Sequence, residues 1–245
     1  MAMLINVSLS GGAAHGVVLA GALTALRQRG LVPHAITGIS SGAMAGALAY
    51  GTDDREHQLE FFRQAFSVAR TRGVRSLLPP YDVSGASTLD FLRPHVPTVE
   101  QICASGVREL WVGVSTWPRF GFEALELLAD ADHEALVTGI ARTSMMPFIT
   151  NDTIHLQGGL DGAFRNNHFT PPGSERPTWL FTYARKPLTS GRGPRKAYER
   201  VVLLRSPFRF ALHLSRSRVA QGWDEGFAQG MALELPDGVG HSTGG

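Results

Sequence analysis

Hydrophobic and polar positions form two strand–turn–helix units at the beginning of the chain. Apolar residues alternate with polar ones over 5–9, which predicts a short strand, and a glycine turn follows at 10–12. Apolar residues at helical spacing then occupy 17–29. A second extended run over 34–37 turns sharply into a helix of small residues over 42–50. Two such units in succession predict an α/β fold, with a parallel or mixed sheet flanked by helices.

The rest of the chain predicts further elements separated by proline and glycine. Residues 73–98 contain four prolines, and we expect loops there that form a lid or a pocket wall. The long final helix contains three glycines, which weaken the helical pattern. The expected helices are one capped by Asp53 or Asp54 that runs to about Arg70, a short one near Leu89, 132–144 and 208–231. The expected strands are 110–115, 154–156, 179–183 and 201–204.

Composition is that of a folded protein with one core. The 245 residues are 43% hydrophobic and 18% charged, so we expect a single domain over 1–235 and a flexible tail over 236–245. No signal-peptide pattern and no transmembrane stretch is seen, which predicts a cytoplasmic or peripheral membrane protein. Cys103 is the single cysteine, which excludes an internal disulfide and a thiolate metal cluster. We expect no cofactor and no metal ion.

The net charge of +2 conceals a strongly basic segment over 185–218. Ten basic residues and one acid give this segment a charge of +9, so the remainder carries −7. Such a segment can dock on anionic phospholipid headgroups, or it can expose arginines on a solvated face while its apolar residues pack inside. No nucleic-acid-binding module is recognised, so nucleic acid is not expected as a partner.

The first candidate for chemistry is Gly38-Ile39-Ser40-Ser41-Gly42, a G-x-S-x-G pattern between an expected strand and an expected helix. A serine on such a turn projects its hydroxyl outward, and glycines two residues to either side prevent clashes. The pattern therefore predicts a nucleophile at Ser40. The alternative is an ordinary turn in which Ser40 or Ser41 caps the helix.

A glycine-rich loop, Ser10-Gly11-Gly12-Ala13-Ala14-His15-Gly16, lies between the first strand and helix. Small residues there let backbone amides converge on an oxyanion or a phosphate. No Gly-Lys-Ser/Thr follows, so this is not a Walker loop. A nucleotide-binding loop of another kind and a plain turn remain as alternatives.

The third candidate is Asp161 in Leu160-Asp161-Gly162-Ala163, which we place in a turn after the strand 154–156. Taken alone, an Asp-Gly pair favours an Asx turn or a helix cap over a catalytic role. An α/β-hydrolase triad is disfavoured, because only one strand–helix unit precedes Ser40 and no later histidine is well placed. The later histidines considered are His168, His213 and His241.

Together these motifs resemble the patatin-like phospholipase family. The resemblance rests on the glycine-rich loop, the serine turn about 25 residues later and the Asp-Gly-Ala motif well downstream. The segment 143–147 is similar to the small-residue and proline segment before the family's acid. Residues 220–223 are similar to part of its closing helix.

The resemblance implies a three-layer α/β/α fold with a mostly parallel central sheet, and hydrolysis of lipid esters. Ser40 would be the nucleophile and Asp161 its base. The amides of Gly11, Gly12 and Ala13 would form the oxyanion hole. The remaining motif glycines are Gly38, Gly42 and Gly162.

Two loop residues depart from the family pattern G-G-G-x-R/K-G. Ala13 replaces the third glycine, and its amide stays free if its φ is negative. His15 replaces the basic residue, and it would support the loop or an anionic headgroup only when protonated, below about pH 6.5. The alternative for His15 is a surface histidine on the first helical turn.

These observations favour a serine acyl hydrolase that cleaves phospholipids or related lipid esters. Two other functions are considered: a catalytically weak relative that binds lipid or a protein partner, and a general carboxylesterase that uses one of the histidines. The residues do not indicate headgroup, acyl chain length or oligomeric state.

Overall fold

The computed structural model describes residues 4–67, 85–146, 154–183, 198–208 and 215–236. Several expectations fall wholly or partly on the other residues. The described chain omits part of the expected lid over 73–98 and part of the basic segment over 185–218. Also outside the described residues are Pro147, His213 and most of the expected tail over 236–245.

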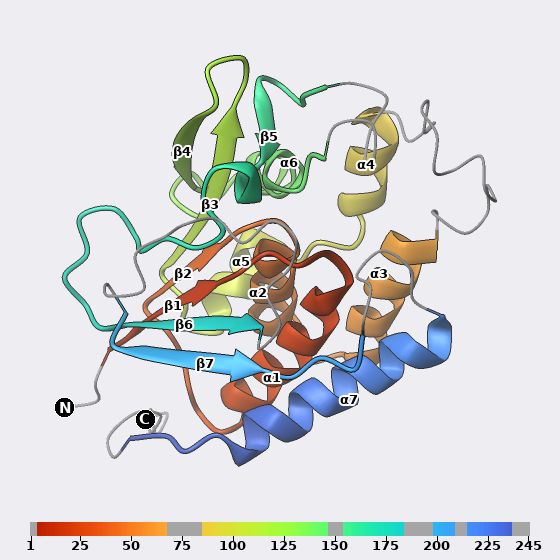
Figure 1. Ribbon diagram of the computed structural model, residues 1–245, viewed down its shortest axis with the longest axis vertical. Coiled ribbons are helices and arrows are strands. Elements are labelled where there is room, and N and C mark those ends of the chain that lie inside the picture. Colours follow the sequence, from red (N-terminus) through yellow and green to blue (C-terminus); the bar gives the residue numbers. More distant parts are fainter. Residues whose placement is uncertain (1–3, 68–84, 147–153, 184–197, 209–214, 237–245) are drawn as a thin grey trace.

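A seven-stranded, mostly parallel sheet forms the centre of the molecule (Figure 1). Its order is β4-β3-β2-β1-β6-β7, and β5 pairs with β3. Strands β1, β2, β3, β6 and β7 are parallel, whereas β4 and β5 run antiparallel to β3. The strands are β1 (Asn6–Leu9), β2 (Ala35–Gly38), β3 (Glu109–Thr116), β4 (Gly121–Glu126), β5 (Gly159–Asp161), β6 (Thr178–Tyr183) and β7 (Arg200–Leu204). The expected α/β fold is confirmed.

Helices flank this sheet and follow the predicted positions closely in the first third of the chain (Figure 1). The helix after the second strand begins at the residue that follows Ser40. Of the two candidate caps for α3, Asp54 is the one used, because its Oδ1 accepts from the amides of Glu56 and His57. The helices are α1 (Gly16–Gln28), α2 (Ser41–Gly51), α3 (Arg55–Ser67), α4 (Gly85–Leu92), α5 (Val99–Ala104), α6 (His133–Thr143) and α7 (Arg216–Ala232). Two short 3-10 helices are η1 (Ala13–His15) and η4 (Gly162–Phe164).

The strand expected over 154–156 is displaced to β5. Leu156 and Gly159 exchange both backbone hydrogen bonds across a two-residue turn. The turn residues, Gln157 and Gly158, have φ of 47° and 73°, which reverses the chain. Asp161 therefore ends a strand, whereas the sequence predicted that it follows one.

The final helix begins later than predicted. Ser215 is its N-cap, and the Ser215 side chain accepts from the amide of Arg218. Phe208, the expected first residue, is buried but not helical. The sequence prediction also missed α5 and β4. Thr98 and Gln101 form a capping box at the start of α5, which is a readable signal for so short a helix.

Helices α1 and α7 pack with their backbones in close approach, side by side in Figure 1. A β-carbon added to Gly226 would overlap the carbonyl oxygen of Val18, and one added to Gly21 would overlap that of Trp223. Gly222 and Gly230 lie one turn to either side of Gly226, so glycine recurs at every fourth position. The glycines that weaken the helical pattern therefore create the contact that holds this helix.

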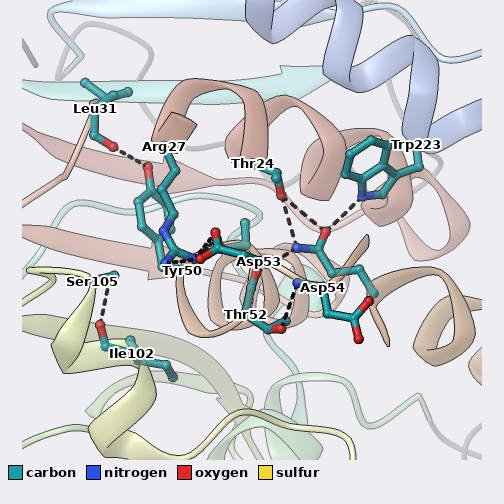
Figure 2. A network of polar contacts seen from close by, with 12 residues as sticks. Thr24, Arg27, Leu31, Tyr50, Thr52, Asp53, Asp54, Ile102, Ser105 and Trp223 are labelled. Carbon is teal, nitrogen blue, oxygen red and sulfur yellow. Dashed lines mark hydrogen bonds and ion pairs between the residues drawn. The ribbon is translucent and has the colours of Figure 1, made fainter. Parts of the chain in front are cut away.

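A buried amide joins α7 to two other helices. Gln58 on α3 is fully buried, and its Oε1 accepts from Trp223 Nε1 at 2.8 Å. Its Nε2 donates to Thr24 Oγ1 and to the carbonyl oxygen of Thr52, both at 3.1 Å. Figure 2 shows Thr24 and Trp223 pointing toward this amide from α1 and α7. The oxygen and the nitrogen of the Gln58 amide thus both have hydrogen-bond partners inside the core.

Candidate active site

Ser40 lies between β2 and α2 in a strained backbone conformation. Its φ of 51° and ψ of −127° are sparsely populated by residues other than glycine. The carbonyl oxygen of Ser40 accepts from the amides of Ala43 and Met44, which begins α2. The structure therefore has the sharp strand-to-helix turn that the sequence pattern predicts.

The glycines on either side of this turn are required by close backbone contacts. A β-carbon at Gly38 would lie 2.5 Å from the Cα of Ala43. One at Gly42 would lie 2.6 Å from the carbonyl oxygen of Leu9 on the neighbouring strand. The steric reason given for the pattern thus applies at both positions.

A threonine from a distant helix fixes the amide of Ser40. The Ser40 N–H donates to Thr143 Oγ1 at 3.1 Å, and Thr143 Oγ1 donates to the carbonyl oxygen of Gly113 at 2.5 Å. Thr143 is fully buried at the end of α6, in the small-residue segment singled out in the sequence. The strained turn is thereby tied to β3 and α6.

Asp161 ends β5 and lies beside this turn. Its side chain is 4% exposed, and Val114 of β3 is its register partner. Burial raises the pKa of Asp161 to about 6, although the nearby Ser40 hydroxyl and the amide of Ala163 lower it. The Ala163 amide donates to Asp161 Oδ1 at 2.8 Å. Ser40 and Asp161, far apart in the sequence, are thus neighbours in the folded chain.

The glycine-rich loop lies directly against Ser40. Strands β1 and β2 are parallel neighbours, with Leu9 opposite Gly38, so the turns that follow them lie side by side. A β-carbon at Gly11 would lie 3.1 Å from the Cβ of Ser40. The loop, the serine and the aspartate therefore occupy one place in the molecule.

The three loop amides are in different situations. The Gly11 amide donates to Asn167 Oδ1 at 3.0 Å, and the Gly12 amide donates to Ser41 Oγ at 3.2 Å. Within the described part of the chain, no hydrogen bond is made by the amide of Ala13. Ala13 has a φ of 49°, in the left-handed region, so the condition of a negative φ is not met, yet its amide has no partner among the described residues. The backbone keeps a conformation that suits glycine although alanine occupies it.

His15 is half-buried beside an aromatic pair. Its Nδ1 lies 2.6 Å from Ser206 Oγ, and its ring centroid lies 5.1 Å from that of Tyr183 and 6.0 Å from that of Phe208. Burial lowers the pKa of His15 from its usual value of 6.5. The imidazole is therefore neutral at neutral pH, and it lacks the fixed charge of the arginine or lysine in the family pattern.

Asn167 is a site residue that the sequence prediction missed. It is 3% exposed, accepts from the Gly11 amide and donates from Nδ2 to the Gly11 carbonyl oxygen at 3.3 Å. It follows Asp161 by six positions, so it connects the segment of the acid to the loop. The contact between Asn167 and Gly11 spans 156 residues, so no local motif marks it. The one signal in the sequence is that Asn167 lies close to Asp161.

The remaining charged candidates are only partly described. Of the basic segment over 185–218, Arg200, Arg205, Arg216 and Arg218 lie in described residues. Among the described residues, no group of three or more His, Cys, Asp or Glu side chains is arranged to hold a metal ion. None of the described helices has the length and apolar character needed to cross a bilayer.

Comparisons with known proteins agree with these motifs. A family model described as patatin-like phospholipase matches residues 7–172, which include the loop, Ser40 and Asp161. No match was found among curated proteins.

Two solved structures match this chain, and the match to VipD shows similarity in fold. VipD from Legionella pneumophila has 13% sequence identity and a TM-score of 0.52, over 94% of this chain and 66% of VipD. The type III effector protein ExoU has 13% identity and a TM-score of 0.42, over 94% of this chain and 52% of ExoU. This chain thus spans less than two thirds of either protein.

Proposed function

The chain belongs to the patatin-like phospholipase family, and we propose that it is a serine lipid acyl hydrolase with a Ser40–Asp161 dyad. The observation that carries the proposal is the position of Ser40, on its strained turn, beside the buried carboxyl group of Asp161, whose pKa the serine side chain lowers. The proposed substrates are carboxylic esters of phospholipids or related lipids.

In the first step, Ser40 Oγ attacks the ester carbonyl carbon and Asp161 accepts the hydroxyl proton. An ordinary aspartate is a weak base toward a serine hydroxyl. A pKa of about 6 makes Asp161 a stronger base that is still ionised at neutral pH. No histidine takes part in this step, because Asp161 lies beside Ser40 and serves as the base.

The tetrahedral intermediate carries a negative oxygen, for which the loop supplies amides. We assign the Ala13 amide as the first donor, since no described residue accepts from it. The Gly12 amide is the second, because its bond to Ser41 Oγ is long at 3.2 Å and an oxyanion is a stronger acceptor. The Gly11 amide, which we expected in this role, is assigned to fixing the loop through Asn167.

Collapse of the intermediate breaks the ester C–O bond. Asp161 returns its proton to the leaving alcohol or lysolipid, and the acyl group stays on Ser40 Oγ. A water molecule then attacks the acyl-enzyme while Asp161 accepts its proton. Departure of Ser40 Oγ, reprotonated by Asp161, releases the fatty acid and restores the enzyme.

The test combines covalent labelling with hydrolysis. We expect a fluorophosphonate probe to label the wild-type protein, and we expect hydrolysis within a panel of a short-chain nitrophenyl ester, a phospholipid and a triglyceride. Ser40→Ala removes the nucleophile and should lose both signals while the thermal unfolding transition persists. Ser41→Ala is the matched control for the adjacent hydroxyl and should still be labelled.

The same experiment separates the alternatives. A folded wild-type protein that the probe does not label would favour a catalytically weak relative that binds lipid. Labelling of Ser40 that is lost on replacing His168 or His213 would favour a histidine-dependent esterase over the dyad.

A further inference from the structure

An exposed apolar cluster lies at the tip of the β3–β4 hairpin. Trp117 and Phe120 are 37% and 48% exposed, and Ile154 from the segment before β5 is 39% exposed. The ring centroids of Trp117 and Phe120 are 5.4 Å apart in an edge-to-face arrangement. The ring centroids of Trp117 and His155 are 6.4 Å apart, so two segments distant in sequence form one surface. We call Trp117, Phe120 and Ile154 the hairpin-tip surface.

Backbone pairing holds this surface in place. Thr116 is the register partner of both Gly121 on β4 and Gly159 on β5. The Trp117 amide donates to the carbonyl oxygen of Gly158 at 2.8 Å. The exposed rings therefore stand on three paired strands, which limits the entropy that they would lose on binding.

The surface is close to the proposed catalytic acid. Asp161 is opposite Val114, three residues before Trp117 along β3. At about 3.3 Å per residue, the tip begins about 10 Å beyond that acid. Phe164 on η4, three residues after Asp161, is also 49% exposed, and η4 packs against β3.

The charges around the surface are basic. Arg119 at the hairpin tip and Arg165 after η4 are exposed, and among the described residues neither forms an ion pair. The segments 117–122 and 154–165 contain a single acidic residue, the buried Asp161, and the partly exposed Glu123 that follows the first segment is paired with Arg142 at 3.1 Å. Exposed aromatic rings beside arginines without an ion pair among the described residues match the interface of a bilayer, where rings enter the headgroup region and arginines meet lipid phosphates.

We propose that the hairpin-tip surface docks on phospholipid bilayers that contain anionic lipid and so brings the dyad to its substrate. This inference rests on the proposed lipid hydrolase function. It concerns a surface separate from the basic segment over 185–218.

Vesicle flotation tests the docking. Ser40→Ala protein is used as the parent so that the lipid stays intact, with vesicles of phosphatidylcholine with or without phosphatidylserine. We expect the parent to float with the vesicles that contain phosphatidylserine. Trp117→Ala/Phe120→Ala should reduce the bound fraction about tenfold, because two rings no longer leave water. Leu203→Ala removes an equally exposed apolar side chain on β7 and is the matched control.

A charge variant tests the docking independently if the double variant does not fold. Arg119→Glu should bind phosphatidylcholine vesicles as the parent does and should lose most of its preference for phosphatidylserine. Added salt should weaken the parent's binding to phosphatidylserine in the same way.

Hydrolysis separates failure of docking from failure of the proposed function. With Ser40 intact, Trp117→Ala/Phe120→Ala should hydrolyse a soluble short-chain ester at the wild-type rate and vesicle phospholipid at least tenfold more slowly. If no ester is cleaved, the proposed function fails, while flotation still tests the docking. Unchanged flotation of the double variant, equal loss on soluble ester, or self-association through this surface without vesicle binding would each overturn the inference.

Discussion

At the scale of single residues, the burial of Asp161 has consequences for both activity and stability. The carboxyl group is 4% exposed and its pKa is raised to about 6. Only the ionised form can accept the proton of Ser40. We therefore expect kcat/KM for a soluble ester to rise with pH through an apparent pKa of about 6 and to level off above it. A pH–rate profile with a limb near 4 would show that Asp161 titrates as an ordinary aspartate.

The raised pKa also predicts the effect of Asp161→Asn on stability. The folded pKa of about 6 exceeds the unfolded value of about 3.9, so the carboxyl group stabilises the fold at low pH and this contribution is lost as pH rises through 6. Asn lacks the charge and should be more stable at pH 8, by up to about 3 kcal/mol. Urea unfolding at pH 8 and pH 5 measures the difference, which should shrink at the lower pH. The variant should be folded and inactive; an active, folded Asp161→Asn protein would disprove the dyad.

Asn167 is predicted to act by positioning the loop. Its two hydrogen bonds to Gly11 fix the backbone next to the two amides that we assign to the oxyanion. Asn167→Ala should lower kcat by up to about 100-fold with little change in KM for a soluble ester, since the loss is felt in the transition state. The rate of fluorophosphonate labelling should fall in parallel. Asn166→Ala, at the preceding position, is the control; a fall in Tm without a change in kcat would leave Asn167 only a structural role.

The sequence predicted the residues with local signatures and missed those defined by distant contacts. Ser40 and Asp161 stand in short motifs whose spacing could be recognised. Asn167 acts through a hydrogen bond that spans 156 residues, and no local pattern marks it. Thr143 lies in the small-residue segment that the sequence singled out, but its hydrogen bond to the Ser40 amide spans 103 residues and was not predicted. The positive φ of Ala13 could not be predicted from the sequence, because alanine rarely occupies that conformation and the surrounding fold imposes it.

At the scale of elements, the close contact between α1 and α7 should reverse the usual effect of replacing a helix glycine by alanine. Replacing glycine by alanine in an exposed helix stabilises it by about 1 kcal/mol. Gly226→Ala should instead destabilise the protein by about 2 kcal/mol or more, because the new methyl group overlaps the carbonyl oxygen of Val18. Chemical denaturation measures the change. Ala228→Gly, on the exposed side of α7, should cost about 1 kcal/mol by propensity alone.

Element boundaries were predictable where local capping decides them. The helices after β1 and β2 and the Asp132 cap of α6 agree with the pattern in the sequence. The start of α7 was mispredicted because apolar residues at 208–214 extend the hydrophobic pattern past the Ser215 cap. The two-residue turn before β5 was missed because Gln157 is not a typical residue for a positive φ.

At the scale of the whole molecule, Gln58 joins three helices through one amide group. Gln58→Leu preserves most of the volume but leaves the Trp223 N–H and the Thr52 carbonyl oxygen without this partner. Each such loss costs about 1–3 kcal/mol, so we expect the free energy of unfolding to fall by several kcal/mol. Calorimetry or denaturant unfolding reports the change. Gln221→Leu on the exposed side of α7 should have a small effect, and an equally small effect of Gln58→Leu would refute the role of this network.

The class of fold could be predicted from the sequence, but the strand order could not. Two strand–turn–helix units in succession indicate a parallel or mixed sheet. The insertion of β6 and β7 beside β1, and the short β5 on β3, depend on pairings between segments more than 100 residues apart or separated by a whole helix. That pairing, rather than any local pattern, brings Asp161 to Ser40.

The glycine contact between α1 and α7 has a consequence for how this sequence can diverge. Contacts between backbones do not depend on which side chains surround them. Helix α7 can therefore change most of its residues and keep its packing against α1 if every fourth position remains glycine. The family model ends at residue 172, before β6, β7 and α7, whereas the structural similarity to VipD extends over 94% of the chain. In a mutational scan of α7, substitutions should therefore be tolerated at most positions and rejected at every fourth one, where glycine lies against α1.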